Sequence, residues 1–145
     1  MSSTHTSQIT SKHQSAFGRL WRVGFLTVLA AVIANILIAL VVKALFPVAP
    51  TFLPLQLGSV IVFTVIGVVG AVIAFALIMR WAKHPLRLFQ RIAWAVLLLS
   101  LLPDVLLAFV ELFPGTTLPE VGGLLLMHVA TACICLGTLS RVKYW

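Results

Sequence analysis

The sequence predicts an all-α protein, a membrane-spanning four-helix bundle with both termini in the cytoplasm. Of its 145 residues, 61% are hydrophobic and 9% are charged, whereas soluble domains have roughly 45–50% and 25%. A helix needs roughly 20 residues to cross a hydrocarbon core about 30 Å thick. Four apolar runs meet this requirement: 23–46, 57–79, 92–113 and 121–139. They are expected to be helices because backbone groups in lipid must be satisfied within the segment, and a barrel would need short alternating strands.

The basic residues predict the orientation. The formal charge of +7 would also suit nucleic-acid binding, but nine of the ten Lys and Arg residues fall in segments that a four-span topology puts on one side. The positive-inside rule therefore places both termini in the cytoplasm and gives no reason to expect a nucleic-acid partner. Basic groups at this interface also favour contact with anionic lipids of the inner leaflet. In the middle loop these groups are Arg80, Lys83, Arg87 and Arg91; the others on this side are Lys12, Arg19, Arg22, Arg141 and Lys143.

Two domains of unequal size are expected. Residues 1–17 are rich in Ser and Thr and lack an apolar cluster, so they are interpreted as a mobile cytoplasmic tail. Residues 18–145 form the four-transmembrane-helix domain. A cleavable signal peptide is the alternative for the first span, but its apolar region would be about 7–15 residues long. The run here has 24 residues, so the span is expected to remain as an anchor.

The connections between the spans differ in composition. The first outer loop, 47–56, has three prolines and no charge and is expected to lie over the bundle. The middle loop, 80–91, is predicted to be a basic topology determinant. The second outer loop, around 114–120, has Pro and Gly residues typical of a compact turn. Beside these loops, Lys43 and Glu111 have similar calculated depths and are predicted to pair at the outer rim.

The second span has the composition of a helix-packing surface. Gly67 and Ala71, and likewise Gly70 and Ala74, are four residues apart. Small residues at this spacing let helices approach closely. Whether that contact lies within one chain or between two chains is open from the sequence.

Three polar residues occur at a similar depth in three different spans. Asn35 lies 13 positions after Arg22, Asp104 lies 13 after Arg91, and His128 lies 13 before Arg141. At a rise of 1.5 Å per residue each is about 20 Å from the inner boundary. Polar groups in lipid face the bundle interior and bind one another. We therefore predict an intramembrane cluster of Asn35, Asp104 and His128.

Two hydroxyl residues extend this prediction. Ser100 lies one turn before Asp104, and Thr131 lies three residues after His128. The second span offers Gly67 at that level, so it is expected to supply space and no polar group. The Asp/His pair could be a neutral acid beside an imidazole or an ion pair, and either form could exchange a proton. Pro103 is expected to kink the third span beside Asp104.

No motif indicates catalysis or a cofactor. Cys133 and Cys135 lie two apart on one predicted helix, so their side chains diverge and a disulfide is not expected. Four-span oxidoreductases of the vitamin K epoxide reductase type use a CxxC pair with loop cysteines, and this chain has neither. Too few His and carboxylate residues gather to predict a metal site. Phosphate-binding and nucleophile patterns are also missing, so we predict no enzyme activity, no cofactor and no metal.

The segments WRVGFLTVLAAVIANILIAL, LLLSLLPD and LLLMHVATA resemble an uncharacterised family of bacterial four-span integral membrane proteins, a domain of unknown function. The resemblance covers about Gly18 to Ser140. It implies a multi-pass protein of the inner membrane and carries over no catalytic residue. The CxC pattern of Cys133 and Cys135 in the fourth span is not a feature associated with that family.

The function predicted from these features is that of a small integral membrane protein with a structural or accessory role, whose polar cluster fixes the register of the helices. The alternative is a proton-coupled small-molecule transporter or channel element acting as an oligomer, because four short helices enclose little volume. A homo-oligomer or a membrane-protein partner suits both hypotheses.

Overall fold

The computed structural model describes the backbone of residues 4–107, 109 and 116–142, and the side chains of these residues from residue 18 onward. Within these ranges the secondary structure is helical and has no β-strand, which confirms the predicted all-α class. Four helices are long and apolar enough to cross a membrane. The elements are α1 (Thr4–Leu45), the 3-10 turn η1 (Leu53–Leu55), α2 (Leu57–Trp81), α3 (Pro85–Leu107) and α4 (Leu118–Leu139).

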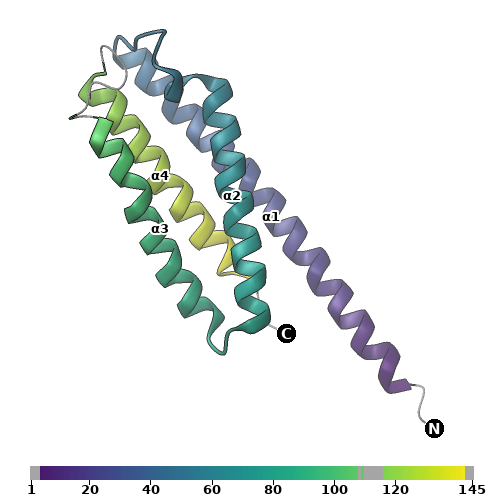
Figure 1. Ribbon diagram of the computed structural model, residues 1–145. Coiled ribbons are helices and arrows are strands. Elements are labelled where there is room, and N and C mark those ends of the chain that lie inside the picture. Colours follow the sequence, from purple (N-terminus) through teal and green to yellow (C-terminus); the bar gives the residue numbers. More distant parts are fainter. Residues whose placement is uncertain (1–3, 108, 110–115, 143–145) are drawn as a thin grey trace.

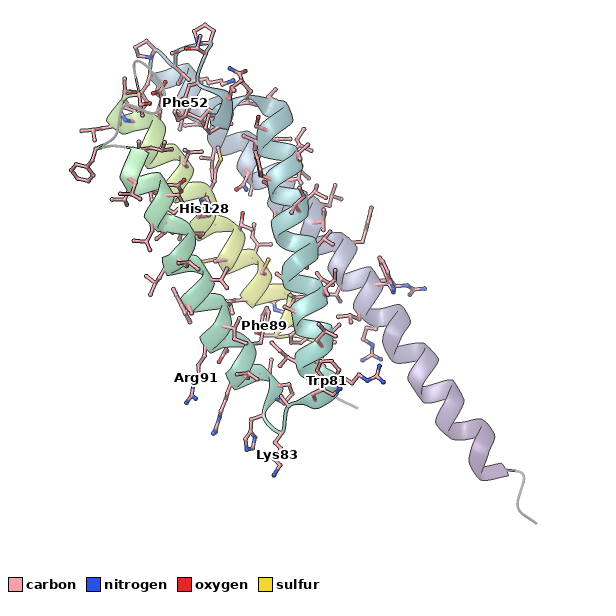
Figure 2. All side chains as sticks on the ribbon, in the orientation of Figure 1. Phe52, Trp81, Lys83, Phe89, Arg91 and His128 are labelled. Atoms are coloured by element: carbon pink, nitrogen blue, oxygen red, sulfur yellow. The ribbon has the colours of Figure 1, made fainter. Side chains whose placement is uncertain are left out.

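The four helices run up and down beside one another (Figure 1). The first part of α1, the end of α4 and the connection between α2 and α3 lie at one end of the bundle. We call this the basic end; Lys83 and Arg91 extend from it in Figure 2. The end of α1, the start of α2, the end of α3 and the start of α4 lie at the opposite end, here called the far end.

Helix α1 is longer than the first predicted span. It begins at Thr4 and extends well past the other helices at the basic end (Figure 1). The backbone of residues 4–17 therefore continues the spanning helix, although the segment lacks the apolar stripe of a packed helix. Its predicted mobility and cytoplasmic location stay predictions.

The middle connection is shorter than the sequence indicates. Residues 80–91 were expected to form a loop, but α2 continues to Trp81 and α3 begins at Pro85, which leaves only residues 82–84 between them. Proline suits the first helical position because its missing N–H would have no helical partner there. The carbonyl of His84 accepts the Leu88 N–H at 3.1 Å. The expectation was wrong because these helices extend past the apolar runs, which end at charged residues.

The far-end boundaries also follow from local chemistry. Helix α1 ends at Leu45 because Phe46 precedes Pro47, and a residue before proline disfavours helical backbone. Helix α3 contains Pro103 and continues to Leu107. The predicted third span runs on to residue 113, and residues 108 and 110–113 lie outside the described residues. Thr117 precedes α4 and forms a capping box with Glu120.

The buried side chains form two apolar clusters. Helix α1 packs on α2 and α4, and α3 packs on α2 and α4. In the basic-end cluster, the Phe75 and Phe89 rings meet edge to face at 4.9 Å. Its fully or nearly buried members are Ala31, Val68, Phe75, Phe89, Cys135, Leu139 and Val142. The far-end cluster comprises Ala39, Val42, Phe52, Leu55, Val60, Leu124 and Met127.

The glycines that pack closely are not the predicted ones. A Cβ atom at Gly67 or Gly70 would meet no neighbouring atom within 4 Å, so neither allows a close helix contact within this chain. A Cβ at Gly24 would lie 3.1 Å from Val72 Cγ1, and one at Gly123 would lie 3.0 Å from Val42 Cγ2. Ala71 packs beside the basic-end cluster, and Ala74 is half-buried. Contact between chains through Gly67 and Gly70 stays a prediction.

We expect Gly24→Leu to destabilise the bundle and Gly67→Leu to leave it unchanged. The first change forces a side chain into Val72, and overpacking of this kind costs about 1–3 kcal/mol. The second places the same side chain in open space. Thermal unfolding in one detergent measures both effects. A loss of stability in Gly67→Leu equal to that in Gly24→Leu would show that another chain packs against this face.

Candidate functional site

Polar residues separate the two apolar clusters in three of the four helices. Asn35 lies midway between Ala31 and Ala39 on α1, four residues from each. On α2, Thr64 lies four residues from Val60 and from Val68; on α4, Thr131 lies four from Met127 and from Cys135. Residues four apart lie on one face of a helix. The inward faces of α1, α2 and α4 therefore contribute a polar layer between two apolar ones.

The amide of Asn35 joins three helices. Its Nδ2 donates one hydrogen bond to Thr64 Oγ1 on α2 and one to Thr131 Oγ1 on α4, both at 2.9 Å. Asn35 and Thr64 are buried. Because the Nδ2 group has two protons, both are used in contacts between helices. Asn35 thus fixes the relative depth of α1, α2 and α4.

Asp104 and His128 form a second polar group between α3 and α4. Asp104 Oδ2 lies 3.0 Å from His128 Nδ1, and the Asp104 side chain is 10% exposed against 39% for His128. Nδ1 is also 3.0 Å from the Leu124 carbonyl oxygen. A carbonyl oxygen only accepts hydrogen bonds, so Nδ1 carries a proton in this contact. The other ring nitrogen, Nε2, is then the position at which His128 gains or loses a proton.

The predicted cluster is therefore two adjacent groups. Asn35 pairs with Thr131, and Asp104 pairs with His128. His128 and Thr131 are three residues apart on α4, a rise of about 4.5 Å. Among the described residues no hydrogen bond joins the two groups. Asp104 thus lies beside His128, and Thr131 binds Asn35.

Ser100 and Thr64 differ from the sequence prediction. Ser100 Oγ donates to the Leu97 carbonyl oxygen of its own helix at 2.8 Å, so it does not extend the cluster. This backward hydrogen bond is a common alternative for a serine within a helix. Thr64 was missed because depth counted from Arg80 selects Gly67, one turn nearer the basic end. The tilt of α2 changes by that one turn which of its residues lies level with Asn35. The hydroxyl group of Thr64 is the feature of the sequence from which this contact could have been predicted.

Two buried acceptors have no hydrogen-bond partner among the described residues: Asn35 Oδ1 and Asp104 Oδ2. Asp104 Oδ2 approaches His128 Nδ1 closely, but the contact lies outside hydrogen-bonding geometry. An unsatisfied buried acceptor costs about 1–3 kcal/mol. A protonated His128 ring would offset this cost at Asp104 electrostatically.

Further polar contacts are found toward each end of the bundle. Toward the basic end, Thr27 Oγ1 lies 2.8 Å from Thr138 Oγ1, joining α1 to α4. At the far end, Lys43 Nζ donates to Gln56 Oε1 at 3.4 Å. The predicted partner of Lys43, Glu111, lies outside the described residues.

Metal-ligating and thiol groups are dispersed. Among the described residues, no group of three His, Cys, Asp or Glu side chains is close enough to hold a metal ion. Cys133 and Cys135 are both free; the first is exposed and the second is buried. The two thiols therefore face different surroundings, as their spacing on one helix predicts.

A family model described as "Family of unknown function (DUF6069)" matches residues 15–143. This match includes all four membrane-compatible helices and both polar groups. No curated protein matches the chain, and no solved structure matches it.

We expect Asn35→Leu to lower the free energy of unfolding by about 1–2 kcal/mol, because two hydrogen bonds between helices are lost. A double-mutant cycle with Thr64→Val tests the contact itself. The two changes should be less than additive, since each removes the same bond. Ser100→Ala is the control, because its hydroxyl bonds only to its own helix. Strict additivity of Asn35→Leu and Thr64→Val would contradict the assigned contact.

Proposed function

We propose that this chain, which belongs to the DUF6069 family, is a small multi-pass integral membrane protein with a structural or accessory role and no enzymatic activity. The observation that carries the proposal is the use of the Asn35 amide, whose two protons bind α2 and α4. In hydrocarbon, a polar group needs an internal partner. The contacts of Asn35 thus serve assembly of the bundle and leave neither proton of its amide free for a substrate.

The hydroxyl groups support a role without catalysis. A serine or threonine nucleophile needs a base within hydrogen-bonding reach. Ser100 lies on the same helix as Asp104 but donates to the Leu97 carbonyl. Thr138 donates to the Ile134 carbonyl at 2.7 Å. Thr131 accepts from Asn35. In these contacts the hydroxyl groups bind backbone carbonyls or the Asn35 amide, and not a general base.

We further propose that the membrane is the plasma membrane, the inner membrane of a bacterial cell, and that the basic end faces the cytoplasm. The support is the distribution of charge: Arg80, Lys83, Arg87 and Arg91 lie near the short connection between α2 and α3. Basic groups there would lie beside anionic headgroups, each contributing about 1 kcal/mol. The lipids of the inner leaflet are the proposed partners of this end.

A proton-linked carrier or channel element is the second candidate, favoured by the Asp104–His128 pair. A buried carboxylate held 3.0 Å from a half-exposed imidazole is a group that can hold a proton within a membrane. Because the Nδ1 proton is donated to the Leu124 carbonyl, exchange would take place at Nε2. In this role an oligomer would supply the volume that one four-helix chain does not enclose.

Asp104 variants distinguish the two roles. If the pair only holds α3 on α4, Asp104→Asn should keep a polar partner for His128 and unfold within a few degrees of wild type, whereas Asp104→Leu should unfold at lower temperature. If the pair carries protons, Asp104→Asn should abolish proton flux in proteoliposomes while the protein stays folded. Proton flux equal in wild type and Asp104→Asn would reject the carrier role.

The orientation is tested with paired reporter fusions in a bacterial host. We expect a fluorescent protein at the C-terminus to fluoresce and alkaline phosphatase at the same position to be inactive, because the basic end stays in the cytoplasm. The same two reporters placed after Thr116, just before α4 at the far end, should give the reverse result. Active phosphatase at the C-terminus would contradict the proposed orientation.

A further inference from the structure

A short segment covers the far end of the bundle. Residues 46–56, here called the cap, connect α1 to α2 and contain η1. Phe52 and Leu55 of the cap are 1% and 0% exposed and belong to the far-end cluster. Figure 2 shows Phe52 at this end of the molecule. The cap is therefore seated in the apolar core by two side chains.

The cap is also held by a carboxylate from the other side of the bundle. Glu120 at the start of α4 is fully buried. Its Oε2 accepts the Thr117 N–H at 2.7 Å, and its Oε1 accepts the Ala49 N–H at 3.1 Å. One oxygen thus caps α4, and the other binds the backbone of the cap.

The second contact is more than helix capping requires. A capping box needs a single acceptor oxygen on the third residue of the helix. A buried carboxylate is costly unless it is fully hydrogen-bonded. The N-terminus of α4 and two backbone N–H groups stabilise it here. Removing the carboxylate would leave the N–H of Ala49 without its acceptor. Gln56 of the cap makes separate contacts, with Lys43 and with the Pro50 carbonyl oxygen.

We infer that Glu120 is a latch that keeps the cap closed, and that the cap is the movable element controlling access from the far end to the bundle interior. Beneath the cap lie Ala39, Val60 and Met127 of the far-end cluster. Four residues deeper on the same helices lie Asn35, Thr64 and Thr131. Opening the cap would shorten the apolar barrier above the polar layer. This goes beyond the proposed function, because it holds for an accessory protein and for a carrier.

Amide hydrogen exchange of the full-length protein in nanodiscs tests the latch. In Glu120→Ala, the Ala49 amide should exchange at least tenfold faster than in wild type, while amides in the middle of α4 keep their wild-type rates, because the opening is local. Thr117→Val is the matched control. It removes the capping hydroxyl and keeps the Thr117 N–H and both oxygens of Glu120, so the Ala49 amide should stay protected.

Two results in Glu120→Ala would overturn the inference. The first is an Ala49 amide in Glu120→Ala that exchanges within twofold of wild type. The second is equal acceleration at Ala49 and throughout α4, which would assign Glu120 to general stability. Glu120→Gln is the second variant and has one carbonyl oxygen for two N–H donors. It should accelerate exchange at Ala49 or at Thr117, and wild-type protection at both positions would count against the latch.

Discussion

The two hydrogen bonds donated by the Asn35 amide are the constraint on which the bundle depends. Apolar side chains are nearly as favourable against lipid tails as against one another, so they place few limits on how deep each helix sits. An amide in hydrocarbon is different, because its protons must find acceptors inside the protein. Thr64 and Thr131 meet this requirement at one relative depth of α1, α2 and α4. A shift of α1 by a turn would place Ala31 or Ala39 opposite both acceptors.

Helix α3 is attached in another way. Of the four membrane-compatible helices it is the least buried: 11% of the residues in its most apolar stretch are buried, against 28% in α1 and in α4. Its buried described residues are Phe89, Leu97 and Asp104. Phe89 meets Phe75 near the basic end, and Asp104 lies against His128 further along. These two contacts are of opposite character, one aromatic and one polar. Most of the α3 surface therefore remains available to lipid or to a neighbouring protein.

The sequence was most informative where a chemical requirement is strong. The four spans follow from length and apolar composition, and the pairing of Asp104 with His128 follows from the cost of isolated polar groups in lipid. Thr64 was harder to predict because its level depends on helix tilt, which a count from Arg80 does not contain. Gly67 and Gly70 have the expected spacing but make no close contact within this chain, and their contact with a second chain stays a prediction. Gly24 and Gly123 became recognisable only once Val72 and Val42 were opposite them.

The two close glycine contacts have a consequence for how α1 can move. At Gly24, toward the basic end, α1 meets α2 through Val72; at Val42, toward the far end, it meets α4 through Gly123. Asn35 lies between these points and holds both neighbours. Helix α1 is thus bound to both neighbours at Asn35 and makes one close contact near each end, with α2 at the basic end and with α4 at the far end. Rocking α1 toward α2 near Gly24, or toward α4 near Val42, would compress a contact that has room only for the hydrogen atom of a glycine, so these two contacts restrict how far α1 can tilt.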